Sequence, residues 1–405
     1  MPTALSETSE MHTTKLQATE QKATEQEATE PKSFADMSGP ERWQHATPIS
    51  EALEDAPSQK HFSSYIYYRN ITKRIWTVMQ EGMRRGFQFK VLGDVTDRTF
   101  VASRDGKGFT YRIYPGHVSF WCQYDDYDAE QAKAHKLALM KADGLSVPVA
   151  YGLFNTFEEI PLSKCCFPLV AKPNTGSLSE NVFPHLQNAA QLKQAADTIA
   201  ASGKKIQVES HIYGKDYRVL ILDHQYAGCV ERRPANVVGD GQRTIAQLFQ
   251  ARNAEPGRAA RDEAHTTIHY LVFDDTTHHL LENAGYTSET ILPAGETFHL
   301  QTKITASTGS DYIDCTEHIH PSIIESCVAF SYRFTTLTLG FDVITTDISR
   351  PLTETHGAFN EYNFLPYVDL HENCNIGTKR PVCELIWDHI EARSSQIVTP
   401  DFEWF

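Results

Sequence analysis

At 405 residues, of which 40% are hydrophobic and 11% aromatic, the chain is long enough to bury a large core and to fold as two or three subdomains. Its formal net charge of -15 argues against a protein that binds nucleic acid through a general basic surface, and it favours small-molecule partners. Its eight cysteines show no CxxC spacing and follow no secretory signal, which favours reduced thiols and a cytoplasmic location. No apolar run approaches the roughly 18 residues of a membrane span, so we expect no membrane partner.

Residues 1–58 form a tail rich in Thr, Glu, Ala and Gln. The sequence Ala-Thr-Glu-Gln occurs at 18–21 and again at 23–26, and Ala-Thr-Glu-Pro follows at 28–31. Such a composition cannot bury a core, so we expect the tail to be disordered or transiently helical and to carry no catalytic residue.

Residues 59–125 are expected to form a small N-terminal α/β domain. Apolar residues recur at helical spacing over 71–85, and the alternation over 87–92 predicts a strand. Two further strands are expected at 98–103 and 109–114, with Asp105-Gly106 supplying the turn of a hairpin.

Residues 126–228 are expected to form a central subdomain with an α+β nucleotide-clamp pattern rather than a doubly wound parallel sheet. Its predicted helices lie at 129–143 and 189–202. Its predicted strands lie at 169–172, 206–209, 217–222 and 227–232, and the last two are expected to pair antiparallel.

Residues 229–395 are expected to form a C-terminal subdomain, in which a helix over 322–339 leads into an acidic hairpin. Asp342 lies in the apolar run 339–344, a turn with Pro351 follows, and 358–366 predicts the second strand. Period-two geometry places Glu361 and Asn363 on one face of that strand. Carboxylate and amide oxygens suit a hard cation shared with phosphate, so the hairpin predicts a site for a magnesium nucleotide.

Two weaker signals lie in the central subdomain. Lys172 ends a predicted strand, and Gly176 and Ser177 follow in a loop of small residues through which backbone N–H groups can approach phosphate. Glu209 ends another strand and Asp216 follows seven residues later, a spacing suited to an adenine hinge and a ribose diol. Alone, a lysine at the end of a strand is more often a solvated edge residue, and the segment with Glu209 and Asp216 is equally read as an ordinary strand and turn.

Several motifs together resemble one family. In chain order they are Leu169 to Pro173, Glu209 to Val219, Glu231 to Gly241, Ser307-Thr308-Gly309, Asp347 to Leu352 and Glu361-Tyr362-Asn363. In this order they resemble the ATP-grasp domain of cyanophycin synthetases and of the glutathione-synthetase module of bifunctional glutathione enzymes, over about residues 62–390. The resemblance implies an α+β ATP-grasp fold and a magnesium-dependent use of ATP, with manganese as an alternative ion.

The resemblance also implies roles for single residues. ATP would be bound by Lys133, Lys172, Gly176, Ser177, Glu209, His211, Ile212 and Asp216, with Lys136 as the alternative to Lys133 if the register differs. Magnesium would be held by Asp342, Glu361 and Asn363. The substrate carboxylate and its phosphate would meet Arg218, Arg232 and Arg233, and Lys303 is a hypothesis for a charge that the family places nearby.

The implied reaction is ATP-dependent joining of a carboxylate to an amine through an acyl phosphate, on amino acids or small peptides. Because no muramyl-ligase-like segment follows within the 405 residues, we expect a reaction other than cyanophycin polymerisation. The phosphate loop keeps only Gly176, and Gln301 and Thr302 stand where the family has two arginines. These departures leave an alternative open, a catalytically silent protein that binds nucleotide or a partner as a regulator. The family also implies a homo-oligomer.

Overall fold

The computed structural model describes residues 38, 41, 44, 46–48, 67–68, 71–92, 99–112, 132–176, 180–260, 268–334, 336–364, 366–393 and 402–404. Most of the predicted tail therefore lies outside the described residues. Within the described part of the chain, no helix combines the length and the apolar character that a membrane crossing would need.

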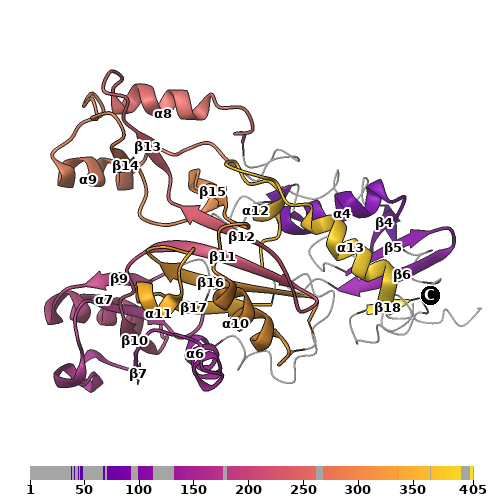
Figure 1. Ribbon diagram of the computed structural model, residues 1–405, viewed down its shortest axis with the longest axis horizontal. Helices are drawn as coiled ribbons and strands as arrows, with labels where there is room; N and C mark the ends of the chain where they lie inside the picture. Colours follow the sequence, from indigo (N-terminus) through magenta and orange to yellow (C-terminus); the bar gives the residue numbers. More distant parts are fainter. Residues whose placement is uncertain are drawn as a thin grey trace, which may run out of the picture.

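A five-stranded antiparallel sheet lies at one end of the molecule, on the right of Figure 1. Its strands, in spatial order, are β1 (Thr47–Pro48), β4 (Gln88–Leu92), β5 (Thr99–Arg104), β6 (Lys107–Arg112) and β18 (Phe402–Trp404). The predicted hairpin turn is confirmed, since Asp105 and Gly106 take positive φ values of 54° and 76° between β5 and β6. A short pair, β2 (Tyr67–Tyr68) and β3 (Ile71–Thr72), precedes the first long helix.

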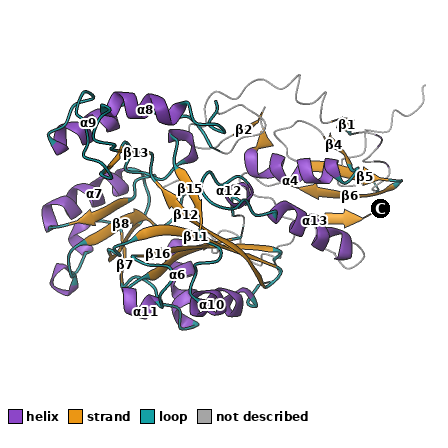
Figure 2. Ribbon diagram, turned by 45° about the horizontal axis from the view of Figure 1, so that its top comes forward, coloured by secondary structure: helices purple, strands orange, loops and turns teal. Residues whose placement is uncertain are grey.

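The core beside this sheet joins distant parts of the chain. Helix α4 (Lys73–Arg84) packs against α13 (Val382–Arg393), and Figure 2 shows the two side by side. Trp387 of α13 is fully buried against Phe87 and Phe89, and its indole nitrogen donates to the Val78 carbonyl at 2.7 Å. The N-terminal α/β unit thus depends on a helix that lies about 300 residues further along the sequence.

A four-stranded sheet follows, with the order β7 (Ala150–Phe154), β10 (Ile206–Ser210), β8 (Leu169–Pro173) and β9 (Phe183–Leu186). Helix α7 (Ala189–Ala201) buries Leu192, Ala196 and Ile199 in the core of this sheet. Asn188 caps the helix by accepting from the backbone N–H of Gln191. Helix α6 (Lys133–Ala142) leads into the subdomain, and the short turns η3 (Phe157–Glu159) and η4 (Leu162–Lys164) follow β7.

The third sheet is the centre of the molecule. Its order is β15 (Asp311–Asp314), β12 (Gln225–Arg233), β11 (Lys215–Leu222), β16 (Thr338–Thr345) and β17 (Ala358–Asn363). The core on one face includes Phe330 of α10 (Pro321–Ser331). The short helix α12 (Asp369–Glu372) packs against β12 and β15, while α11 (Leu352–Thr355) joins β16 to β17. All paired strands of the described residues are antiparallel, which confirms the α+β expectation.

One predicted element ends earlier than expected. The helix predicted over 322–339 stops at Ser331, and Thr338 and Leu339 belong to β16 instead. Their partners across the sheet are Leu222 and Ile221 of β11. A β-branched residue with a partner strand already in place favours extended backbone, so the sheet overrides the helical spacing of the apolar residues.

A smaller lobe, at the upper left of Figure 1, inserts between β12 and β15. It contains β13 (Asn236–Val238), α8 (Ile245–Asn253), α9 (Asp275–Ala284) and β14 (Thr297–His299), and the turn η5 (Ala306–Thr308) leads back to the central sheet. The lobe has a core of its own, which includes Val237, Ile245, Leu281 and Leu300. The sequence pattern did not separate this lobe from the rest of 229–395.

Candidate functional site

The candidate site lies where the four-stranded sheet meets the central sheet. Lys172 of β8 contacts Glu209 of β10 at 2.5 Å, and its Nζ also donates to Asn360 Oδ1 of β17 at 3.3 Å. Gln207 supports Glu209 with a hydrogen bond of 3.0 Å. Lys172, Glu209 and Gln207 are all buried, so this lysine is held in place by contacts with both sheets.

Helix α6 brings two further lysines to the same place. Lys136 is buried, pairs with Glu361 of β17 at 3.3 Å and lies 5.5 Å from the centre of the Tyr362 ring. Lys133 donates from Nζ to the carbonyl of Gly176. Burial lowers the pKa of Lys133, the positive charges of Lys172 and Lys136 lower it further, and Glu361 opposes the shift. Both alternatives that the sequence left open, Lys133 and Lys136, therefore lie beside Lys172.

The acidic hairpin forms as predicted between β16 and β17. Asp342 lies directly opposite Glu361, and the register shifts by one residue immediately afterwards, so that Asn360 has no partner of its own on β16. This β-bulge turns Asn360 and Glu361 toward the same side, while Tyr362 is buried and Asn363 is again partly exposed. The period-two pattern predicts Glu361 and Asn363 on this face of the hairpin. The bulge adds Asn360 as a third residue with a side-chain oxygen.

Two arginines and two carboxylates form a network on the neighbouring strands of the sheet. Arg218 and Asp342 are buried, whereas Arg232 and Asp216 are partly exposed. Arg218 donates from Nε to Asp342 Oδ1 at 2.6 Å, and Arg232 contacts Asp342 Oδ2 at 3.2 Å. Arg232 also donates to Asp216 Oδ1 at 2.5 Å. These contacts follow from the register, in which Arg218 is opposite Asp342 and Asp216 is opposite Arg232.

The network sets the charge of both carboxylates. Burial would raise the pKa of Asp342, but the guanidinium groups of Arg218 and Arg232 outweigh it and lower the pKa. Burial raises the pKa of Asp216, and the neighbouring Asp342 charge adds to that rise against the pull of Arg232. The two arginines therefore hold the pKa of Asp342 below that of Asp216.

The remaining predicted residues fall into three groups. Glu209, His211 and Ile212 follow one another along β10 and its exit, and the His211 ring lies 5.1 Å from that of His185 and 4.8 Å from that of Tyr213. Arg233 is not brought into the cluster, because strand alternation turns it away from Arg232 to pair with Glu231 at 2.6 Å. Lys303 is exposed in the segment before η5, and Ser177 lies outside the described residues.

Among the residues that contact the predicted set, sequence reasoning missed Asn360 and Lys204. Asn360 reaches Lys172 only because of the β-bulge, which no local pattern announces. Lys204, in the turn between α7 and β10, lies beside Gly176, with its Nζ 3.0 Å from where a Cβ on that glycine would be. The one available signal for Lys204 was a Gly203-Lys204-Lys205 turn directly before the predicted adenine-hinge strand.

The fold is that of the ATP-grasp class. Among solved structures, a bifunctional glutathione synthetase from Pasteurella multocida matches the chain with a TM-score of 0.59 at 22% identity, covering 79% of this chain and 43% of that one. The α+β ATP-grasp fold predicted from the motifs is confirmed.

Two curated relatives carry the same resemblance at the level of sequence. A cyanophycin synthetase from Trichormus variabilis is 31% identical over 253 residues, which are 62% of this chain and 28% of that protein. A glutathione biosynthesis bifunctional protein from Clostridium perfringens is 25% identical over 332 residues, covering 79% of this chain and 41% of the relative. No protein-family model matches the chain. The chain thus resembles both kinds of synthetase, as its motifs predicted, and spans less than half the length of these relatives.

Proposed function

We propose that this chain is an ATP-dependent carboxylate–amine ligase that forms an amide bond and releases ADP and phosphate. The observation that carries the proposal is the convergence of three lysines on the hairpin of Asp342 and Glu361. Lys172 reaches Asn360 of that hairpin from the other sheet, Lys136 pairs with Glu361, and Lys133 contacts Gly176 beside them. The names of the relatives, cyanophycin synthetase and glutathione biosynthesis protein, support amino acids or small peptides as substrates.

The donor set fits magnesium. Asp342 and Glu361 offer carboxylate oxygens and Asn363 offers an amide oxygen, which are donors that a hard cation prefers, and three such residues are too few to fill an octahedral shell. Phosphate oxygens and water would complete it, as expected for an ion that arrives with a nucleotide. Magnesium, with manganese as the alternative, would neutralise charge on the transferring phosphoryl group.

The residues of the chain supply binding and charge, since the reaction needs no protein nucleophile. Lys172 and the lysines of α6 bind the triphosphate of ATP. Arg218 and Arg232 hold the carboxylate of the substrate against the γ phosphorus of that triphosphate. A carboxylate oxygen attacks that phosphorus, the bond to the β–γ bridging oxygen breaks, and ADP leaves. Burial raises the pKa of the thiols of Cys229, Cys327 and Cys383, which keeps these cysteines protonated and inert.

The second half of the reaction joins the amine. The ammonium substrate first loses one proton to water, and the nitrogen of the free amine then attacks the carbonyl carbon of the acyl phosphate. The C–O bond to phosphate breaks, and the leaving phosphate takes up one proton from the nitrogen, which keeps the other as the amide N–H. One carboxylate, one ammonium and one ATP thus give one amide, one ADP, one phosphate and one proton. Arg218 and Arg232 offset the charge of the departing phosphate as they did that of the γ phosphate.

A substrate screen tests this proposal. Full-length protein with magnesium and ATP is mixed with pairs of amino acids and dipeptides, ADP release is followed, and the product mass is measured. We expect ADP release that requires an amine in at least one pairing, with a product lighter by one water than the sum of its substrates. No amine-dependent ADP release across the panel would refute the ligase assignment.

A second candidate, nucleotide binding without turnover, is supported by Gln301. It stands where the resemblance implies one of two arginines, and its side chain donates instead to Asp274 Oδ1 at 2.9 Å, at the N-terminus of α9. Tight binding of ATP without ADP release in any pairing would favour this candidate.

A further inference from the structure

The segment that follows β8 is surrounded by lysines from separate elements. Asn174 ties these elements together: its carbonyl accepts from Lys133 N at 2.8 Å, and its Oδ1 accepts from Ala134 N at 3.0 Å. Its own N–H donates to the carbonyl of Lys205 at 3.0 Å. The start of α6, the end of β8 and the turn between α7 and β10 are therefore held against one another.

That turn places Lys204 beside the phosphate loop. The Nζ of Lys204 lies 3.0 Å from the position that a Cβ on Gly176 would occupy, and the carbonyl of the same glycine accepts from Lys133 Nζ. Gly176 has a φ of 117°, in the region that favours glycine, so the close approach of Lys204 depends on the absence of a side chain. Lys204 itself is partly buried.

The local charges are unbalanced. Lys172 is paired with Glu209 and Lys136 with Glu361, whereas among the described residues neither Lys133 nor Lys204 has a carboxylate partner. Lys204 is one of the positive charges that help burial to lower the pKa of Lys133. Two ammonium groups beside one glycine, neither in direct contact with a carboxylate of the described residues, make a site that a multiply charged anion would stabilise.

We propose that Lys204 is a binding residue for the triphosphate of ATP, which it contacts beside Gly176 together with Lys133. The inference rests on the proposed function and adds to it a residue that the motifs do not include. The sequence from Asn174 to Val182 contains only one glycine, and Glu180 adds a negative charge to it. Lys204, from the turn between α7 and β10, supplies a positive point charge that attracts the phosphates in place of glycine backbone N–H groups.

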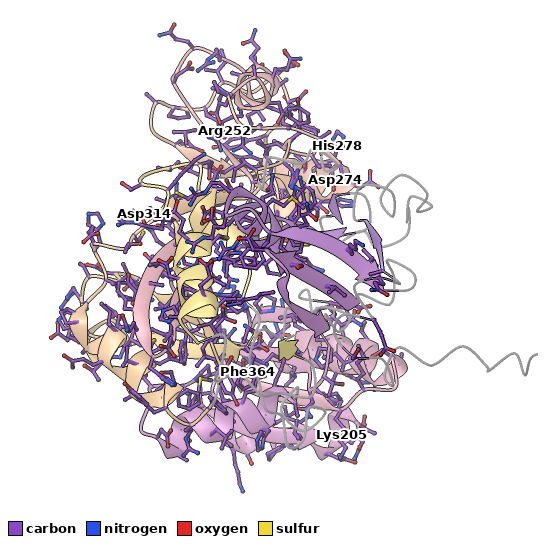
Figure 3. The ribbon with its side chains drawn as sticks, turned by 90° about the vertical axis from the view of Figure 1, so that its right-hand side faces the viewer. Lys205, Arg252, Asp274, His278, Asp314 and Phe364 are labelled. Carbon is purple, nitrogen blue, oxygen red and sulfur yellow. The ribbon has the colours of Figure 1, made fainter. Side chains whose placement is uncertain are left out.

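The test compares Lys204→Ala with Lys205→Ala. The two lysines lie in the same turn and carry the same charge. Lys205, however, is exposed, and it contacts Asn174 only through its backbone carbonyl, which an alanine variant keeps. Figure 3 marks Lys205 near the lower edge of the molecule. Binding of magnesium-ATP, magnesium-ADP and AMP to the full chain is measured by titration calorimetry, and thermal unfolding of each variant is recorded.

We expect Lys204→Ala to weaken ATP binding about 10- to 100-fold, as for the loss of a charge-assisted contact. The loss should be smaller for ADP and within about twofold for AMP, because the contact is with phosphate. Lys204→Arg should restore most of the ATP affinity, and Lys205→Ala should stay within about twofold of wild type.

Equal ATP affinity of the two alanine variants, with wild-type protein that binds ATP, would overturn the role of Lys204 and leave the proposed function standing. An equal loss for AMP and ATP would also overturn it, since the residue would then act on the fold of the site. If Lys204→Ala fails to fold, Lys204→Gln keeps the stem without the charge and is judged by the same comparison. Wild-type protein that binds no nucleotide would overturn the proposed function and this inference together.

Discussion

Replacing Asp342 by asparagine separates the role of its charge from that of its shape. Asp342 is 8% exposed and accepts from Arg218 at 2.6 Å and from Arg232 at 3.2 Å. Asparagine can keep one acceptor for Arg218, but its NH2 group then faces a guanidinium and the cluster gains a net positive charge. Breaking a buried ion pair costs about 3–5 kcal/mol, so with one hydrogen bond kept we expect about 3 kcal/mol. A domain with about 5–15 kcal/mol of stability remains folded.

Activity should fall far more than stability. If Asp342 holds magnesium against the phosphates, ADP release at saturating ATP should fall about 100-fold or more. The matched control is Asp216→Asn, which removes one charge from the same cluster and breaks the 2.5 Å contact with Arg232. Because Asp216 is predicted to hold the ribose, this variant should raise the KM for ATP about tenfold and keep turnover within about tenfold of wild type.

The assay is ADP release as a function of ATP and of magnesium, with urea unfolding of each variant in parallel. A turnover of Asp342→Asn above a tenth of wild type would refute the assignment of Asp342 as a magnesium ligand. Equal losses of turnover in the two variants would also refute it, since the cluster would then act only as a structural unit.

Three further predictions concern stability. Gly82→Ala should destabilise the protein by about 1–3 kcal/mol in urea unfolding, because its Cβ would lie 2.2 Å from Trp387 Cζ2, and a net gain from the better helix propensity of alanine would contradict this packing. Asp311→Asn should cost about 3–5 kcal/mol at pH 7, since Asp311 is buried and accepts from two arginines. Burial would raise the pKa of Asp311, but those arginines lower it below the unfolded value of 3.8. The contribution of Asp311 to the free energy of unfolding is therefore present above pH 3.8 and is lost as pH falls, so the difference in stability between wild type and Asp311→Asn should shrink below pH 4. Burial lowers the pKa of His371 from 6.5 to about 3, so as pH falls the unfolded chain binds a proton at this residue before the folded chain does. Relative to His371→Leu, the free energy of unfolding of wild type should therefore fall by about 1.4 kcal/mol per pH unit below pH 6.5. Parallel pH profiles of the two proteins would exclude this prediction.

Local patterns were sufficient for much of the fold. The turn at Asp105-Gly106, helix α7 and the pairing of β11 with β12 follow from short-range spacing and turn chemistry, and the structure contains each of them. The helix predicted through Leu339 was too long because the pairing of β16 with β11 decided that segment. A helical spacing of apolar residues carries no information about a strand that lies more than 100 residues away.

The site was predicted in the same uneven way. Asp342 stood out because it interrupts an apolar run, and Lys172 stood out because it ends one. The position of Arg233 was not predicted, because side-chain alternation along β12 turns it away from Arg232 and pairs it with Glu231. The contact of Asn360 with Lys172 could not be predicted either, because it depends on a bulge in one sheet and a strand end in another.

The sequence by itself therefore determined the class of fold, the acidic hairpin and the identity of most charged residues around it, because these depend on residue type and short spacing. Only the tertiary structure decided which charges meet. Arg218 and Arg232 neutralise Asp342 because three strands are in register, and Lys204 stands beside Gly176 because Asn174 fastens one turn to another. The physical reason is that electrostatic contacts act over a few ångströms, and only the folded chain brings residues from distant segments within that range.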